Sequence, residues 1–121
     1  MSRKINKYYI KPEDFQSEYD KSLSIDEITP KLYNMFFTIA ENSVVLLKMQ
    51  NQQDIDAVIN YAITEIWKSK WKRYDTKRTV NIFSFFTTVI LNDMRTHKNY
   101  IMRLRERSVS IDAIFNGSKE K

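Results

Sequence analysis

Cationic and aromatic side chains alternate within one short stretch of the 121-residue chain, between residues 67 and 85. Single-stranded or melted nucleic acid is bound by this combination, because cations follow the phosphates and flat rings stack on exposed bases. An alternative is that Trp67 and Trp71, four residues apart beside Ile63 and Ile66, belong to a hydrophobic core, and this alternative is favoured more for Trp67. The residues concerned are Lys68, Lys70, Lys72, Arg73, Lys77 and Arg78, with Trp67, Trp71, Tyr74 and Phe85 among them.

Positive charge continues along the second half of the chain. Residues 1–60 contain seven Lys or Arg and nine Asp or Glu, whereas residues 61–121 contain 13 and six. The two halves therefore carry −2 and +7, within a net charge of +5. Such asymmetry indicates an acidic partner for the second half, most often nucleic acid, although a solvated surface is an alternative. The later cations are Arg95, Lys98, Arg103, Arg105 and Arg107.

Residues suited to catalysis or metal binding are scarce. The one histidine, His97, lies on an apolar helical stripe, where a core or interface role is typical. Asp54 and Asp56 are two residues apart and would point in different directions on a helix. One glycine excludes a glycine-rich phosphate loop, and the chain has no cysteine. We therefore expect a binding protein rather than an enzyme, with no metal, cofactor or small-molecule substrate.

Composition favours a single all-α domain. Hydrophobic residues make up 42% of the chain and aromatic residues 13%, which is enough for a core at this length. One glycine and two prolines leave few turns, so long helices are the default. The N-terminus lacks the apolar segment of a signal peptide, and no apolar run could span a bilayer. We expect a soluble, cytoplasmic protein that does not bind membranes.

Hydrophobic periodicity predicts about four helices packed in a compact bundle. A Ser24–Glu27 capping box would start the second helix, which Pro30 would kink or restart. The third helix has an apolar stripe of Ile55, Ile59, Ala62 and Ile66, widened by Val58 and Ile63. The predicted helices cover residues 12–23, 24–49, 54–72 and 81–107, the domain ends at 107, and residues 108–121 form a flexible tail.

The fourth helix raises a question about Phe85. Its predicted core stripe has spacings of three and four residues, but Phe85 is two residues from Phe83 and would point about 200° away. Thr88, Asn92 and Arg95 share the mixed, partly basic face of Phe85. A large ring there needs a partner outside the bundle, or a contact with the preceding loop or the tail. The stripe consists of Phe83, Phe86, Ile90, Met94, His97, Ile101 and Leu104.

The stretch YDTKRTVNIFSFFTTVILN, residues 74–92, resembles region 2 of bacterial sigma factors. That family has an aromatic-Asp pair, an arginine three residues later and a pattern like Phe-Ser-Thr-Tyr-Ala-Thr-Trp-Trp-Ile. Without a gap, Tyr74 and Asp75 match the pair, and Arg78 matches the arginine. Phe85 falls at the tyrosine, whereas Thr88 and Val89 replace the paired tryptophans that help to open promoters. This departure suggests reliance on partners for melting.

Further segments resemble the late-transcription sigma factors of T-even-type bacteriophages. These segments are YYIKPEDF at residues 8–15, MFFTIAE at residues 35–41 and the stretch after residue 74. Upstream, DIDAVINYAITEIW looks like the helix with which sigma factors bind the clamp helices of the polymerase largest subunit. The tail segment SIDAIF is similar to the motif by which late sigma factors bind the phage sliding clamp, or to the Ser-Leu-Asp-Ala that follows region 2 in longer sigma factors.

The resemblance implies a region 2-like sigma factor that binds host core RNA polymerase. It would recognise and help to melt an AT-rich late promoter element, with Phe85 receiving a flipped base, and a late coactivator and the sliding clamp as further partners. The rival prediction is a helical adaptor or polymerase inhibitor without DNA recognition, and a second rival is a generic basic DNA-binding protein. The implied residues are Asp56, Asn60, Tyr61 and Thr64 for polymerase, Lys77, Arg78, Phe85, Thr88, Asn92, Arg95 and Lys98 for DNA, and Ile111, Asp112, Ile114 and Phe115 for the clamp.

Overall fold

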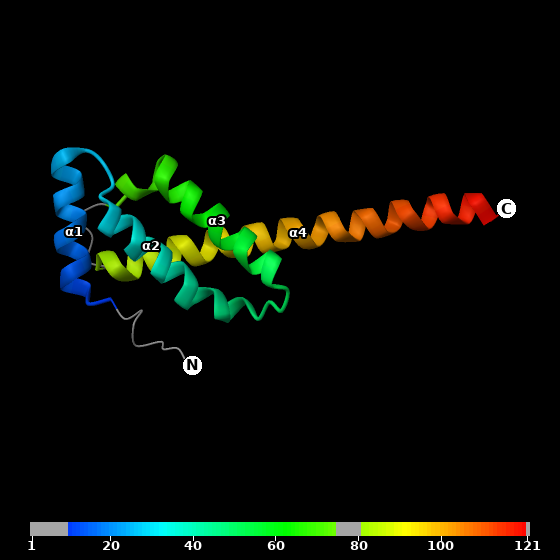
Figure 1. Cartoon of the computed structure of the whole chain (residues 1–121), viewed down its shortest axis with the longest axis horizontal. Coiled ribbons are helices and arrows are strands. Elements are labelled where there is room, and N and C mark those ends of the chain that lie inside the picture. Colours follow the sequence, from blue (N-terminus) through cyan, green and yellow to red (C-terminus); the bar gives the residue numbers. More distant parts are fainter. Residues whose placement is uncertain (1–9, 75–80, 121) are drawn as a thin grey trace.

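The computed structural model describes the backbone of residues 10–74 and 81–120, and side chains in these ranges as far as Arg107. Every regular element in these ranges is helical, which confirms the predicted all-α fold of about four α-helices. None of the helices described has an apolar stretch long enough to cross a bilayer. The elements are α1 (Pro12–Ile25), α2 (Pro30–Ser43), the 3-10 helix η2 (Val44–Leu47), α3 (Gln52–Lys68), the 3-10 helix η3 (Lys70–Lys72) and α4 (Ile82–Glu120) (Figure 1).

A threonine-proline pair starts α2. The Thr29 hydroxyl accepts a hydrogen bond from the Leu32 backbone N–H at 3.1 Å and donates one to the buried Glu18 carboxylate of α1 at 2.5 Å. Pro30 follows at the first helical position, where its missing N–H costs nothing. The sequence predicts that Pro30 either kinks the second helix or restarts it, and the structure shows a restart, because α2 begins at Pro30.

The predicted capping box is wrong. Ser24 lies inside α1, and its hydroxyl donates a hydrogen bond to the Lys21 carbonyl at 2.7 Å. Helix α1 ends one residue later, because Asp26 has a left-handed backbone with φ of 58°. Aspartate tolerates this conformation better than most residues. The turn from Asp26 to Thr29 then directs the chain into α2.

Aromatic rings fill the core where α1, α2 and α4 meet. Phe86 of α4 is fully buried, and its ring centroid lies 5.0 Å from Phe36 of α2. Phe15 and Tyr19 of α1 are 6.0 Å and 5.6 Å away. Burial raises the pKa of the Tyr19 hydroxyl to about 12, with the charge of Asp20 as a smaller cause. The N-terminal helix is therefore an integral part of the core.

Helices α3 and α4 pack antiparallel, as three contacts along their interface indicate. Lys70, just after α3, reaches Asp93, Tyr61 stacks on His97, and Asp54 binds Arg105. Residue numbers thus fall along α3 as they rise along α4. The predicted α3 stripe is confirmed from Val58 to Ile66, whereas Ile55 at its start is only partly buried against the core.

The predicted stripe of α4 is correct in its middle and differs at its ends. Phe86, Ile90 and Met94 are fully buried, but Ile82 rather than Phe83 continues the buried stripe at the start. Leu104 is 40% exposed, although its neighbour Arg105 binds Asp54 near the start of α3.

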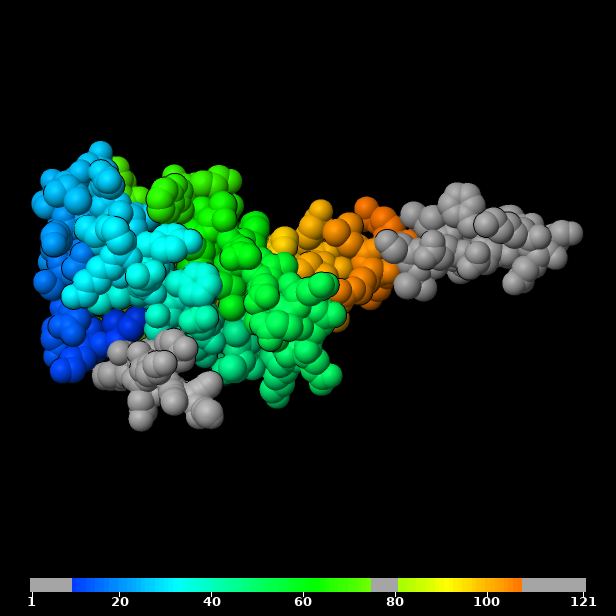
Figure 2. All heavy atoms as spheres, in the orientation of Figure 1, coloured from blue at the N-terminus to red at the C-terminus, as the bar shows by residue number. Residues whose placement is uncertain are grey.

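The sequence predicts that the fourth helix ends at Arg107, but α4 continues to Glu120. Residues 108–116 contain neither glycine nor proline, so no backbone feature stops the helix. The C-terminal half of α4 projects from the bundle (Figure 1). In Figure 2, the part of α4 with described side chains forms a narrow extension beside the bundle.

Candidate nucleic-acid interface

Phe85 lies at the edge of the core rather than in it. Its half-buried ring is edge-on to Phe86, with the centroids 5.1 Å apart, and it also lies 5.3 Å from the ring of Tyr74. Tyr74 lies two residues after the end of η3 and is the first residue of the predicted loop, so the predicted alternative of a contact with that loop is observed. Phe86 takes the fully buried position that Phe85 cannot reach.

A polar face of α4 begins at Phe85. Thr88, Asn92 and Arg95 follow at helical spacing, and all three are exposed. The Arg95 guanidinium donates a hydrogen bond to the Asn92 side-chain oxygen at 3.4 Å. Arg95 has no ion pair within the described ranges. This arrangement combines a half-buried ring, hydrogen-bonding groups and a cation on one side of the helix.

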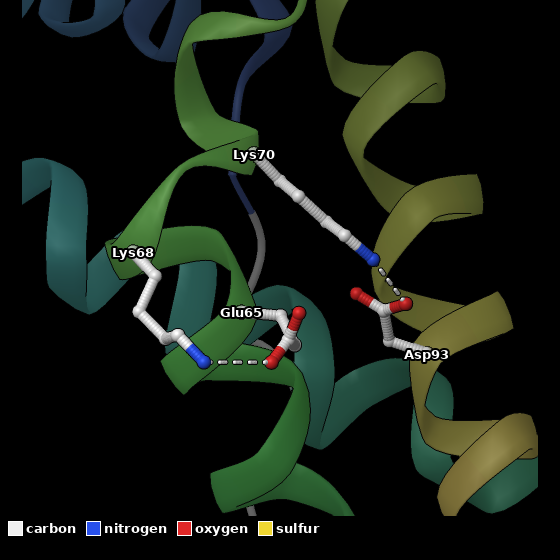
Figure 3. A network of polar contacts seen from close by, with 4 residues as sticks. All are labelled: Glu65, Lys68, Lys70 and Asp93. Carbon is white, nitrogen blue, oxygen red and sulfur yellow. Dashed lines mark hydrogen bonds and ion pairs between the residues drawn. The ribbon is translucent and has the colours of Figure 1, made fainter.

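Several predicted DNA-binding or nearby cations instead form contacts within the fold. Lys70 binds Asp93 at 2.7 Å and Lys68 binds Glu65 at 3.5 Å (Figure 3). Lys98 donates a hydrogen bond to the Leu47 carbonyl at 2.8 Å, which satisfies the end of η2. Lys98 therefore has a structural role that the sequence does not indicate. A further ion pair joins Lys72 to Asp26.

The ion pair between Arg105 and Asp54 is bidentate, with N–O distances of 2.7 and 2.8 Å. The hydrogen bond from Arg105 lowers the pKa of the Asp54 carboxyl. The same contact raises the pKa of the guanidinium. Arg105 thus joins the middle of α4 to the start of α3, where Asn51 caps the helix by accepting a hydrogen bond from the Asp54 N–H at 3.2 Å. The cations Arg73, Arg95, Arg103 and Arg107 are exposed and have no ion pair among the described residues.

The core position favoured for Trp67 is wrong, whereas Trp71, for which the sequence leaves the core alternative open, belongs to the core. Trp67 is 59% exposed and lies edge-on to Tyr33 of α2, with centroids 5.7 Å apart. Trp71 is buried and edge-on to Tyr19. The α-helix ends at Lys68, so η3 turns Trp71 inward. The sequence does contain a signal for the exposure of Trp67. It lies seven residues, or about two helical turns, after the polar Asn60 and therefore shares the polar face of the third helix.

The proposed polymerase face of α3 is only partly accessible. Asp56, Asn60 and Thr64 are exposed along one side of the helix, and Asp56 accepts a hydrogen bond from the Gln52 side chain at 2.9 Å. Tyr61 is half-buried, and its ring stacks on His97 at 4.6 Å with an interplanar angle of 9°. His97 thus has the interface role predicted for it.

Some predicted residues lie outside what the structure describes. Lys77 and Arg78 fall among residues 75–80, which are outside the described ranges. Ile111, Asp112, Ile114 and Phe115 lie on the backbone of α4, and their side chains are not described. Among the described residues, no three His, Cys, Asp or Glu side chains gather in a way that could hold a metal ion.

Comparisons with known proteins add no family. No protein-family model matches the chain, and neither a curated protein nor a solved structure is significantly similar to it.

Proposed function

We propose that this chain is a sigma factor of the region 2 type, which binds bacterial core RNA polymerase and directs it to late promoters of a bacteriophage. Support comes from the short sequence resemblances and from two separate exposed faces on α3 and α4. One face would bind protein and the other promoter DNA. The chain would act in the cytoplasm of an infected bacterial cell.

The α3 face supports a protein contact. Asp56, Asn60 and Thr64 are exposed on the side of α3 opposite its buried stripe. Interface energy is concentrated in few residues, so a short row of this kind is sufficient to carry a contact. The clamp helices of the polymerase largest subunit are the proposed partner.

One observation carries the DNA part of the proposal: Phe85 lies at the core edge on the same face as Thr88, Asn92 and Arg95. A flipped base would stack on this ring after displacing or sharing the contact with Tyr74. Flipping costs a few kcal/mol and stacking returns about 1–3 kcal/mol. Phosphate contacts and the polymerase must therefore supply the remaining free energy. An AT-rich element is the proposed target.

The projecting part of α4 supports a third contact. A late coactivator and the phage sliding clamp are the proposed further partners, and residues 111–115 would bind the clamp. The helical backbone of this segment is the geometry in which an amphipathic helix docks into a groove.

A second candidate function is favoured by the engaged cations. Lys68, Lys70, Lys72 and Arg105 form ion pairs within the fold, and Lys98 binds a backbone carbonyl. Fewer cations therefore remain for phosphates than the 20 Lys and Arg residues of the chain indicate. An adaptor or inhibitor that binds polymerase without recognising DNA requires only the α3 face.

One assay separates the two candidates. Purified core polymerase is incubated with phage late-promoter DNA, with and without the full-length chain, and the transcripts are mapped. A sigma factor produces transcripts from defined start sites only when the chain is present. An adaptor or inhibitor produces none, while still co-purifying with the polymerase.

A further inference from the structure

A hollow of about 600 Å³ lies beside the C-terminal end of α3. The acidic residues Asp26 and Glu27 line it from the turn before α2, and Trp67 and Lys68 line it from α3. Trp71 and Lys72 of η3 complete this part of the wall. The hollow therefore combines two indole rings with cations and carboxylates.

Trp67 is the most exposed aromatic residue of those with described side chains, at 59%. Its edge-on contact with Tyr33, at 86° and 5.7 Å, holds the indole while most of its surface stays accessible. A held but uncovered ring loses little conformational freedom when a flat ligand stacks on it. Trp71 is 5% exposed and serves as a wall.

The charged side chains around Trp67 differ in whether they form ion pairs within the fold. Lys72 binds Asp26 and lies 5.4 Å from the centroid of the Trp71 ring. Lys68 has a long contact of 3.5 Å with Glu65, and its side chain is 63% exposed. The exposed carboxylate of Glu27 has no ion pair within the described part of the chain. One cation and one acceptor therefore remain for a ligand.

We propose that this hollow binds one nucleotide of a single-stranded nucleic acid. The base stacks on Trp67, and Lys68 releases Glu65 to approach a phosphate. Glu27 accepts a hydrogen bond from the base, which favours adenine, cytosine and guanine over thymine, because thymine presents no amino group to a carboxylate. This inference extends the proposed function by adding a second base contact to the one at Phe85.

A chain of ring contacts connects the two sites. Phe85 contacts Tyr74, Tyr74 lies 6.1 Å from Tyr19, and Tyr19 lies 6.3 Å from Trp71. Both sites therefore lie at the same end of the bundle. The ring contacts pass through the fully buried Tyr19, so a strand that occupies both sites must run around the surface of the bundle. A protein partner would instead be expected to use Trp67 with Asn60 and Thr64 on α3.

Tryptophan fluorescence tests the stacking directly, because the chain has only two tryptophans. In the full-length Trp71→Phe variant, Trp67 is the sole indole, and single-stranded dA and dC octamers should quench its emission. The Trp67→Phe variant of the otherwise native chain should show little quenching from buried Trp71. Absence of quenching by either octamer in both the native chain and Trp71→Phe overturns the inference.

Binding of labelled octamers, followed by anisotropy, tests each residue. Trp67→Ala should weaken binding about 5- to 150-fold, as expected for the loss of one base stack, whereas Trp67→Phe retains a ring and should lose less. Lys68→Gln should lower the salt slope by about 0.7, as expected for one single-strand phosphate contact. Lys48→Gln, at an exposed lysine far from the hollow, is the matched control and should leave the slope unchanged.

Two further experiments test the preference for particular bases and the need for a strand longer than one nucleotide. Glu27→Gln should reduce the preference for dA or dC over dT at least threefold, and an unchanged preference overturns the role of Glu27. Adenosine monophosphate should bind at least tenfold more weakly than the dA octamer. Equal affinity overturns the assignment to a strand.

The transcription assay separates this inference from the proposed function. If Trp67→Ala leaves octamer binding intact but abolishes polymerase pull-down, Trp67 is a protein contact and the inference fails while the sigma-factor proposal stands. If Trp67 binds octamers but the native chain directs no promoter-specific transcript, the proposed function fails and the nucleotide site stands.

Discussion

Phe85 and Phe86 are adjacent in sequence, and their ring centroids lie 5.1 Å apart in an edge-to-face arrangement. Only Phe86 is fully buried, because the helix turns Phe85 by about 100° toward the bundle edge. The two rings therefore allow a structural role and a DNA-binding role to be compared at neighbouring positions.

Phe86→Ala should lower the free energy of unfolding by about 3–5 kcal/mol, as for other buried phenylalanines. Phe85→Ala should cost less, about 1 kcal/mol, because half-buried side chains leave smaller cavities. If Phe85 receives a flipped base, its alanine variant should still transcribe poorly from duplex templates and better from premelted ones. Urea unfolding and transcription on both templates are the measurements. Equal transcription from the two templates would mean that Phe85 is structural.

Arg95 and Lys98 should differ in DNA binding, although both are cations of α4. Arg95→Ala should lower the salt slope of duplex binding by about 0.9 and leave stability nearly unchanged, because its side chain is exposed. Lys98→Ala should instead reduce stability by about 1–3 kcal/mol, since the Leu47 carbonyl loses a charged donor. Binding isotherms at several salt concentrations and urea titrations distinguish them. A full unit of salt slope lost from Lys98→Ala without destabilisation would contradict this assignment.

Asp56→Ala combined with Asn60→Ala should weaken core-polymerase pull-down at least tenfold without changing helical circular dichroism. Both residues are exposed, so their loss should not disturb the core. Tyr61→Ala is a less specific probe, because it also removes the stack on His97, a contact of about 0.5–1.5 kcal/mol. Undiminished pull-down by the double variant would rule out the α3 face as the polymerase contact.

Stability should fall as pH rises above 10, and Tyr19 should contribute to the fall. Its folded pKa is about 12, so between pH 10 and 12 the unfolded chain releases a proton that the folded chain retains. Proton release by the unfolded state favours unfolding, and the stabilisation is present below pH 10. Tyr19→Phe should reduce this pH dependence. Urea midpoints of the native chain and the variant at pH 8, 10 and 11 test it, and parallel curves would exclude Tyr19 as a source.

Lys70→Met should cost about 3–5 kcal/mol, because it leaves the buried Asp93 carboxylate without its cation. Only one oxygen of Asp93 is hydrogen-bonded by the described residues, and Lys70 provides that bond. Lys68→Met, in the separate and more exposed pair with Glu65, is the matched control and should change stability by less than about 1 kcal/mol. Thermal melting of both variants is the measurement. Similar losses of stability in the two variants would indicate that the buried Lys70 pair contributes no more than the exposed Lys68 pair.

Much of the fold follows from local pattern. The buried stripes of α2 and α3 are predictable because three- and four-residue spacing places Leu32, Phe36 and Ile59 on core faces. The start of α2 is harder to predict, because two positions have the residues typical of a helix start. Ser24 is followed by Glu27, and Thr29 is followed by Pro30. Tertiary contact decides between them, because Glu18 binds the Thr29 hydroxyl inside the core.

The candidate site is less predictable than the fold. Trp67 and Trp71 lie four and eight residues after Ile63, so spacing predicts the same helical face for both. A change to 3-10 geometry after Lys68 instead buries Trp71 while Trp67 stays exposed. The engagement of Lys98 depends on Leu47, which is 51 residues away in sequence. No local pattern indicates such a contact. Spacing alone does place Phe85 away from the Phe86 position, and the structure agrees.

The continuity of α4 sets the distance between the bundle and whatever binds its far end. Arg105 is the last described residue tied to α3, and a helix rises about 1.5 Å per residue. Ile111 and Phe115 are therefore about 9 Å and 15 Å beyond that anchor along the helix axis. Their spacing from the anchor also fixes their angular position, because each residue adds about 100°. A change in length after Arg107 thus alters reach and direction together, unless it adds seven residues, which extends the reach by about 10 Å with a rotation of only about 20°.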